Sequence, residues 1–231
     1  MSARTRKTAT VKRADDPRVV RSRAVAVDAA RSLFLRKGYA GVTMEEIAAS
    51  AGLARRTLYN TFADKRELFT RIVEDTIKQA GEFAEGLDEG FFSGITAATL
   101  RPALGDLGRR LALGILRPEV IALRRLLVGE TREFPGFAAD YYDRAPGQVL
   151  EALASGFRRL RRSGLLRVAN PRLAADQFAY LVAGEALDRA ILVGKVPPRA
   201  RVRACAREGV RTFLARYERT GRREARVSPA C

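Results

Sequence analysis

The sequence contains no histidine, and only two of its 231 residues are cysteine. The lack of histidine excludes Ser-His-Asp and Cys-His catalysis and histidine-ligated metal sites. Two cysteines are too few for a thiolate metal site or a disulfide scaffold, so we expect no metal and no cofactor. No run of about 18 apolar residues occurs, so no membrane span is expected. The low cysteine content fits a reducing cytoplasm, and the N-terminus lacks the apolar stretch of a signal peptide.

The charge balance is strongly basic. There are 43 Lys and Arg residues against 26 Asp and Glu residues, a formal net charge of +17, while 47% of the residues are hydrophobic. The hydrophobic content predicts a folded protein, and the positive charge favours polyanionic partners. The excess is spread along the chain, however, because residues 1–75 carry 16 basic and 9 acidic groups and the remainder carries 27 and 17. Charge alone is therefore weak support for nucleic-acid binding.

Two capping boxes lie in residues 43–69. In the first, the Thr43 hydroxyl accepts from the backbone N–H of Glu46, and the Glu46 carboxylate reaches back. Asp64 and Glu67 repeat the pattern and open a further helix. Between the two boxes there is room for two short helices joined by a tight turn.

Gly52 ends the first of these short helices. In the second, Ala54, Leu58 and Phe62 recur every four residues and form the predicted inner face. The outer face then carries side chains that can bond to base edges and phosphates, since Arg matches guanine and Asn matches adenine. They are Arg55, Arg56, Thr57, Tyr59 and Asn60. This pattern is typical of a helix-turn-helix recognition helix, although an ordinary solvated helix has the same geometry.

The rest of the chain has helical spacing without strand-like alternation, which predicts an all-α fold. The first helix has the predicted inner stripe Val20, Ala24, Val27, Ala30 and Phe34. Asn170 and Pro171 read as an N-cap followed by proline at the first helical position. The predicted helices are 18–37, 65–81, 95–116 with a break near 102, 118–134, 135–162, 171–193 and 199–219.

The run from Val19 to Phe69 resembles the N-terminal domain of TetR-type transcriptional regulators. The matching elements are, in order, FLRKGYAGVTMEEIAASAGLARRTLYNTFADKRELF. Residues 130–194 are similar, more loosely, to the C-terminal region of the AefR-like branch, in ETREFPGFAADYY, SGLLRVANPRLAADQF and LVAGEALDRAILVG. Arg56 departs from the Gly or Ser that often precedes the recognition-helix Thr, which leaves the operator sequence open.

The resemblance implies an all-α regulator with a three-helix DNA-binding domain and a helical ligand-binding and dimerisation domain. We expect a disordered basic arm at 1–17, the DNA-binding domain at 18–64, the regulatory domain at 65–220 and a frayed tail at 221–231. The arm either adds DNA contacts or is a mobile solvated tail. The resemblance further implies a repressor that binds a palindromic double-stranded DNA operator as a homodimer and is released by a small molecule.

The candidate DNA-binding residues follow from the exposed face and from the family positions. Arg55, Arg56 and Asn60 are the base-reading candidates. By resemblance, Thr43, Thr57, Tyr59 and Lys65 contact phosphates. Thr61 suits either role.

The family places its effector pocket in the C-terminal helices. The residues predicted to line it are Leu123, Leu127, Glu130, Phe134, Phe137, Tyr141, Phe157 and Phe178. This set is mainly apolar and aromatic, which favours a hydrophobic effector oriented by Tyr141 or Glu130. Each residue also fits a plain core position.

Small residues at helical spacing in the last two helices favour close helix approach, either to a second copy or within the chain. They are Ala175, Ala179, Ala183, Gly184, Ala186 and Gly209.

Two function classes compete with a specific regulator. A non-specific architectural DNA-binding protein would share the basic charge. A helical enzyme would need a reactive constellation, and no acidic residue is paired by spacing with a second catalytic group.

Overall fold

The computed structural model describes residues 17–219, except for the side chains of residues 88 and 89. The described chain folds into two compact units. Unit 1 contains the residues up to Ala80 together with Ala122–Ala145, and unit 2 contains Gly81–Ile121 and the residues from Pro146 onward. The predicted tail and all but the last residue of the predicted arm lie outside the described residues.

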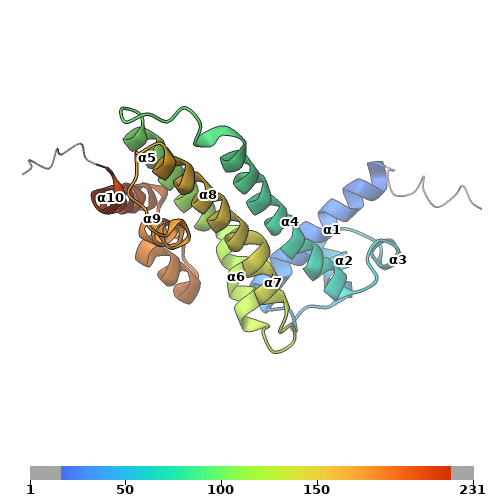
Figure 1. The fold of residues 1–231 in the computed structure, drawn as a ribbon. Helices are drawn as coiled ribbons and strands as arrows, with labels where there is room; N and C mark the ends of the chain where they lie inside the picture. Colours follow the sequence, from blue (N-terminus) through green and yellow to red (C-terminus); the bar gives the residue numbers. More distant parts are fainter. Residues whose placement is uncertain (1–16, 220–231) are drawn as a thin grey trace, which may run out of the picture. The chain divides into compact units, whose positions relative to one another are not determined.

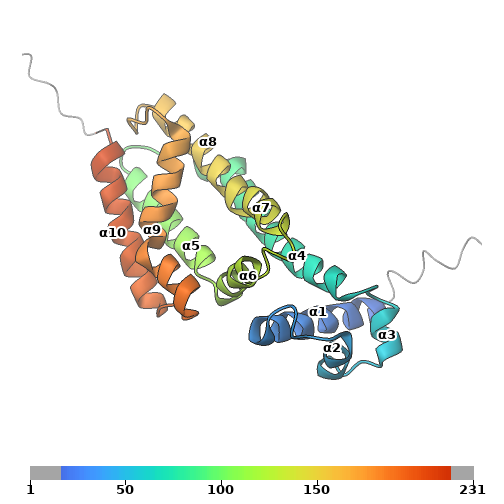
Figure 2. The ribbon, with the colours of Figure 1, turned by 90° about the horizontal axis from the view of Figure 1, so that it is seen from below.

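Unit 1 is built from the first four helices and a later insertion. In Figure 2, α1, α2 and α3 lie together, and each contacts the other two. The helices are α1 (Pro17–Lys37), α2 (Met44–Ser50), α3 (Arg55–Tyr59), α4 (Lys65–Gly86) as far as Ala80, α6 (Pro118–Gly129) from Ala122, and α7 (Phe137–Tyr142). The predicted domain boundary at residue 65 thus differs from the boundary of this compact unit.

Unit 2 is a second bundle. The helix α10 packs against α9 and α5, and α9 also packs against α8 (Figure 1). Its elements are the end of α4, the π-helical turn η2 (Leu87–Phe91), α5 (Leu100–Ile115), α8 (Gln148–Arg162), α9 (Pro171–Val193) and α10 (Arg199–Tyr217). Residues 17–219 contain no β-strand, only an isolated bridge between Leu166 and Glu218. The all-α prediction is confirmed. None of the described helices is long and apolar enough to cross a membrane.

Two of the three predicted helix caps form as expected, and the second capping box forms only in part. Thr43 and Glu46 form both bonds of the capping box. Asn170 caps α9, with Pro171 at the first helical position. In the second box, the Glu67 N–H donates to Asp64 Oδ1 at 2.8 Å, but the Glu67 carboxylate accepts from Ala63 and not from Asp64.

The predicted helices differ from the structure in extent and in buried residues; the helix predicted over 65–81, for example, continues to Gly86. Buried residues of α1 begin at Ala26, so Val20 and Ala24 are exposed, because periodicity does not say how far the packing partners reach. The helix predicted over 95–116 begins at Leu100, and it is not broken near 102 because a proline in the first turn removes no helical hydrogen bond. The helix predicted over 118–134 ends at Gly129, where glycine weakens helix propagation.

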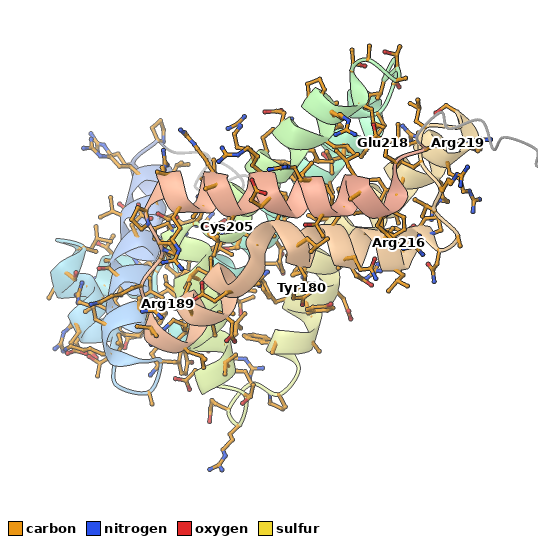
Figure 3. All side chains as sticks on the ribbon, turned by 90° about the vertical axis from the view of Figure 1, so that its left-hand side faces the viewer. Tyr180, Arg189, Cys205, Arg216, Glu218 and Arg219 are labelled. Atoms are coloured by element: carbon orange, nitrogen blue, oxygen red, sulfur yellow. The ribbon has the colours of Figure 1, made fainter. Side chains whose placement is uncertain are left out.

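The remaining differences are interruptions. The helix predicted over 135–162 starts at Phe137 and contains a widened π-helical turn, η3 (Asp143–Gly147), at Pro146, which has no N–H to donate. The helix α9 is broken at Gly184, whose φ of 54° and ψ of −154° lie in a region essentially restricted to glycine. The bend is visible in Figure 3.

Gly209 lets α10 approach the backbone of α9. A methyl group on Gly209 would overlap the carbonyl oxygen of Leu181, a backbone atom that cannot rotate away. We therefore expect Gly209→Ala to lower the free energy of unfolding by about 1–3 kcal/mol. Gly105→Ala in α5 is the control, because a methyl group there meets nothing within 4 Å. It should stabilise the protein by about 1 kcal/mol through helix propensity. Urea unfolding followed by circular dichroism measures both, and equal effects would contradict the packing argument.

Candidate nucleic-acid interface

The N-terminus of α2 is fixed by a small polar network. The Glu46 N–H donates to Thr43 Oγ1 at 3.2 Å, and the Thr43 N–H donates to Glu46 Oε2 at 2.9 Å. Lys37 Nζ lies 2.6 Å from Glu46 Oε1. The hydrogen bond from Lys37, followed by the backbone bond from Thr43, lowers the pKa of Glu46 below its ordinary value. The carboxylate is thus charged at neutral pH and locks the start of α2.

A tight turn separates α2 from α3. Gly52 has a φ of +64°, and a methyl group there would meet nothing within 4 Å, so backbone conformation and not space requires glycine. The turn closes with a 2.9 Å bond from the Leu53 N–H to the carbonyl of Ala48. Leu53 itself is partly buried against the core. This turn sets the direction in which α3 leaves α2.

The helix α3 is anchored by one face and exposes the other. Leu58 is fully buried and Phe62, just beyond the helix, is almost fully buried. Ala54, predicted to lie on the same inner face, is instead the exposed N-cap residue, because α3 has only five residues and begins after it. The exposed side chains are those of Arg55, Arg56, Tyr59 and Asn60. Asn60 is the C-cap residue and directly follows the last turn.

Glu45 of α2 is a neighbour of this face that sequence reasoning missed. Its Oε1 accepts a 3.4 Å hydrogen bond from the Tyr59 hydroxyl and lies 3.9 Å from Nη1 of Arg55. Both contacts are long, and the side chains of Arg55 and Tyr59 remain exposed to solvent. No signal in the sequence pairs residues on two different helices in this way.

Two further predicted contact residues have intramolecular partners. The Thr61 hydroxyl donates to the carbonyl of Thr57 at 2.8 Å. Lys65 Nζ donates to the carbonyls of Tyr39 and Val42, both at 2.8 Å, and lies 4.3 Å from the centre of the Tyr39 ring. Lys65 therefore holds the turn between α1 and α2 with two of its three N–H groups.

All eight predicted DNA-binding residues lie within one stretch of unit 1. They are Thr43, Arg55, Arg56, Thr57, Tyr59, Asn60, Thr61 and Lys65, and they come from the N-terminus of α2, from α3 and the turn after it, and from the first residue of α4. Thr43, Asn60 and the three exposed side chains of α3 reach solvent, whereas Thr57, Thr61 and Lys65 are half-buried. The predicted contact residues therefore divide into an exposed group and a half-buried group.

The predicted effector residues are divided between two cores. Five of the eight belong to the core of unit 1 or pack against it, together with Leu58 and Phe69: Leu123, Leu127, Phe134, Phe137 and Tyr141. Only Phe157 and Phe178 belong to the core of unit 2, where their ring centroids are 5.5 Å apart. The eighth, Glu130, accepts a 3.0 Å hydrogen bond from the Tyr39 N–H. Six of the eight residues thus lie in unit 1 and two lie in unit 2.

Two protein-family models match the chain. Residues 26–72 match the model described as bacterial regulatory proteins of the tetR family. Residues 102–219, which are 118 of the 231 residues, match the AefR-like transcriptional repressor C-terminal domain. Both resemblances inferred from the sequence are thereby confirmed.

Known relatives agree with these matches. A putative TetR-family regulator from Mesorhizobium loti MAFF303099 has a TM-score of 0.75 at 29% identity, covering 88% of this chain and all of that one. The flavonoid-responsive regulator FrrA has a TM-score of 0.61 at 26% identity, covering 87% of this chain and 98% of that one.

Among curated proteins, the HTH-type transcriptional regulator AlkX of Mycobacterium tuberculosis is 27% identical over 105 residues, which are 42% of this chain. The chain spans half the length of this relative. These relatives are transcriptional regulators and not enzymes.

Proposed function

Because this chain belongs to the TetR family of DNA-binding transcriptional regulators, we propose that it is a ligand-released repressor that binds a palindromic operator as a homodimer. The exposed face of α3 is the observation that carries the proposal. A buried anchor at Leu58 turns Arg55, Arg56 and Asn60 outward on a helix small enough to enter a major groove. Such a repressor acts in the cytoplasm, where its operator lies.

The roles on this surface follow from chemistry and exposure. Arg55, Arg56 and Asn60 read base edges, with guanine and adenine as their natural partners. Thr61 is a further candidate for base or phosphate contact. The phosphate contacts, which position the protein without reading sequence, come from Thr43, Thr57, Tyr59 and Lys65.

Arg56 provides the sharpest test of base reading. Arg56→Ala should weaken operator binding by about 1–3 kcal/mol and relax the preference at one base pair in each half-site. The control is Arg71→Ala, which removes the same charge from α4, where Arg71 pairs with Asp75 at 3.2 Å. The Arg71→Ala variant should have the same base preference as the wild-type protein. Gel-shift titrations on a selected operator and on random duplex, at one salt concentration, measure both.

The same titrations separate a regulator from an architectural protein. A regulator should bind the operator at least about a thousandfold more tightly than random DNA. Equal affinities in the wild-type protein would contradict the proposed function and favour a non-specific DNA-binding protein.

We propose that the homodimer forms through α9 and α10. The predicted small residues serve another purpose, since Ala175, Ala183, Ala186 and Gly209 are buried within unit 2 itself. The proposed interface is supported instead by a different set of residues, which are exposed. Leu173, Tyr180, Leu192 and Val193 of α9 are exposed apolar side chains, and Tyr180 is 61% exposed on the face viewed in Figure 3. Burying such residues against a second copy would stabilise a two-fold dimer and double the length of DNA that is read.

Tyr180→Glu should disrupt this dimer, because it places a charge where apolar surface would be buried. Sedimentation at micromolar concentration should give about twice the 25.4 kDa chain mass for the wild-type protein and the chain mass for the variant. Tyr142→Glu is the control, since Tyr142 is a comparably exposed tyrosine on α7 in unit 1. A wild-type monomer, or a Tyr180→Glu dimer, would contradict the proposed interface.

We propose that the effector is a hydrophobic, aromatic small molecule. The aromatic core of unit 2, with Phe157 and Phe178, could accept such a molecule, whereas burying the unpaired polar groups of a sugar costs several kcal/mol. The similarity to a regulator named for its response to flavonoids supports the same chemical class. To release DNA, the effector must bind the released conformation more tightly than the DNA-bound one.

A thermal-shift screen tests the effector class. Flavonoids and other hydrophobic aromatic compounds should raise the unfolding midpoint, since a ligand at a hundred times its Kd stabilises the folded state by about 2.7 kcal/mol. Sugars and sugar phosphates are the control set and should not. Compounds that stabilise the protein should then release it from the operator in a gel shift. Stabilisation by polar metabolites alone would contradict the proposed effector class.

A further inference from the structure

The turn between α1 and α2, residues 38–42, is held from two directions. Lys65 donates to the carbonyls of Tyr39 and Val42. Glu130 Oε1 accepts the N–H of Tyr39 at 3.0 Å, across 91 residues of sequence. The turn lies outside any helix, so its peptide groups need partners of this kind.

Aromatic packing holds Glu130 in place. Its carbonyl accepts the backbone N–H of Phe134 at 2.9 Å, which closes a helical turn beyond α6. Phe134 is buried, with its ring centroid 4.7 Å from that of Tyr39 and 5.3 Å from that of Phe69. The segment that carries Glu130 is therefore part of the core beneath the candidate interface.

The turn in question leads directly into the interface. Thr43, the N-cap of α2, follows Val42, and α2 in turn contacts α3 and supplies Glu45 to Arg55. A change in the turn would tilt α2, and with it α3. We propose that Glu130 is a positioning residue for operator binding, which sets the orientation of α2 and α3 through the Tyr39 amide. The inference rests on the proposed function of α3 and assigns Glu130 a role other than orienting a ligand.

The direction of the change in DNA affinity distinguishes a positioning role of Glu130 from a simple charge effect. A carboxylate in a DNA-binding unit repels phosphates, so its removal by itself should strengthen DNA binding. Loss of positioning should weaken it. A pure charge effect therefore predicts tighter DNA binding when the carboxylate is removed, whereas a positioning role predicts weaker binding.

The experiment uses an operator selected by the full-length wild-type protein from randomised duplexes. Glu130→Ala should raise the operator Kd about tenfold, which is ~1.4 kcal/mol. Glu130→Asp keeps the charge but shortens the reach, and it should also bind more weakly. Glu130→Gln keeps an oxygen acceptor and should bind as tightly as the wild-type protein or more tightly. Glu133→Ala is the matched control, because Glu133 is an exposed acid in the same segment, and it should show no loss.

A second readout separates positioning from loss of stability. All variants are assayed at a temperature at which circular dichroism shows the wild-type helix content. Amide hydrogen exchange should then increase in the peptide that contains Tyr39 for the alanine and aspartate variants, and stay unchanged for the glutamine variant. If the alanine variant does not fold, the aspartate and glutamine variants decide between the alternatives.

The outcomes are distinct. If the wild-type protein selects no DNA sequence, the proposed function of α3 fails. If it selects one and both Glu130→Ala and Glu130→Asp bind it as tightly as Glu133→Ala does, the positioning role is overturned. It is also overturned if Glu130→Gln binds as weakly as Glu130→Ala, since the amide oxygen can still accept the Tyr39 N–H.

Discussion

The burial of Leu58 and Phe62 is the constraint on which the candidate interface depends. A five-residue helix cannot hold its conformation through its own hydrogen bonds, because helix nucleation costs more than so few bonds return. The core of unit 1 therefore fixes α3, and the exposed polar residues have a defined direction only because two apolar residues point the other way. Under the proposed function, core residues such as Leu58 and Phe62 would therefore affect operator binding by fixing the direction of α3.

The same core is completed by residues from much later in the chain. The chain passes between the two units near residues 80, 121 and 145. The segment Ala122–Ala145 returns to unit 1 and contributes Leu127 and Phe134 to the core that contains Leu58. In the proposed ligand release, a change in unit 2 would thus have covalent routes into unit 1 through α4 and through both ends of this segment. The proposed effector needs no contact with α3, provided that it prefers one conformation of these elements.

The sequence correctly predicted those structural features that depend on neighbouring residues in the chain. The capping box of Thr43 and Glu46, the turn at Gly52 and the Asn170 cap each depend on a few adjacent residues, and each occurs as predicted. The sequence did not predict which residues from distant parts of the chain pack against a given apolar side chain. Periodicity correctly indicated that Phe134 is buried, but not that it packs against Tyr39 and Phe69 instead of lining a pocket. An apolar pattern specifies that a face is covered, and the fold alone specifies what covers it.

Glu130 and Lys65 illustrate a second limit, which concerns backbone partners. The sequence predicts Glu130 as a ligand-orienting group within a mainly apolar and aromatic set of residues, and it predicts Lys65 as a phosphate contact by resemblance. Both bond peptide groups of the turn at residues 38–42: Glu130 accepts an N–H, and Lys65 donates to two carbonyls, which leaves its third N–H for the proposed phosphate contact. Every residue except proline has the same peptide groups, so no sequence pattern identifies which of them lack a helical partner. That need arises only once the helices end, and here it is met by side chains from two distant parts of the chain.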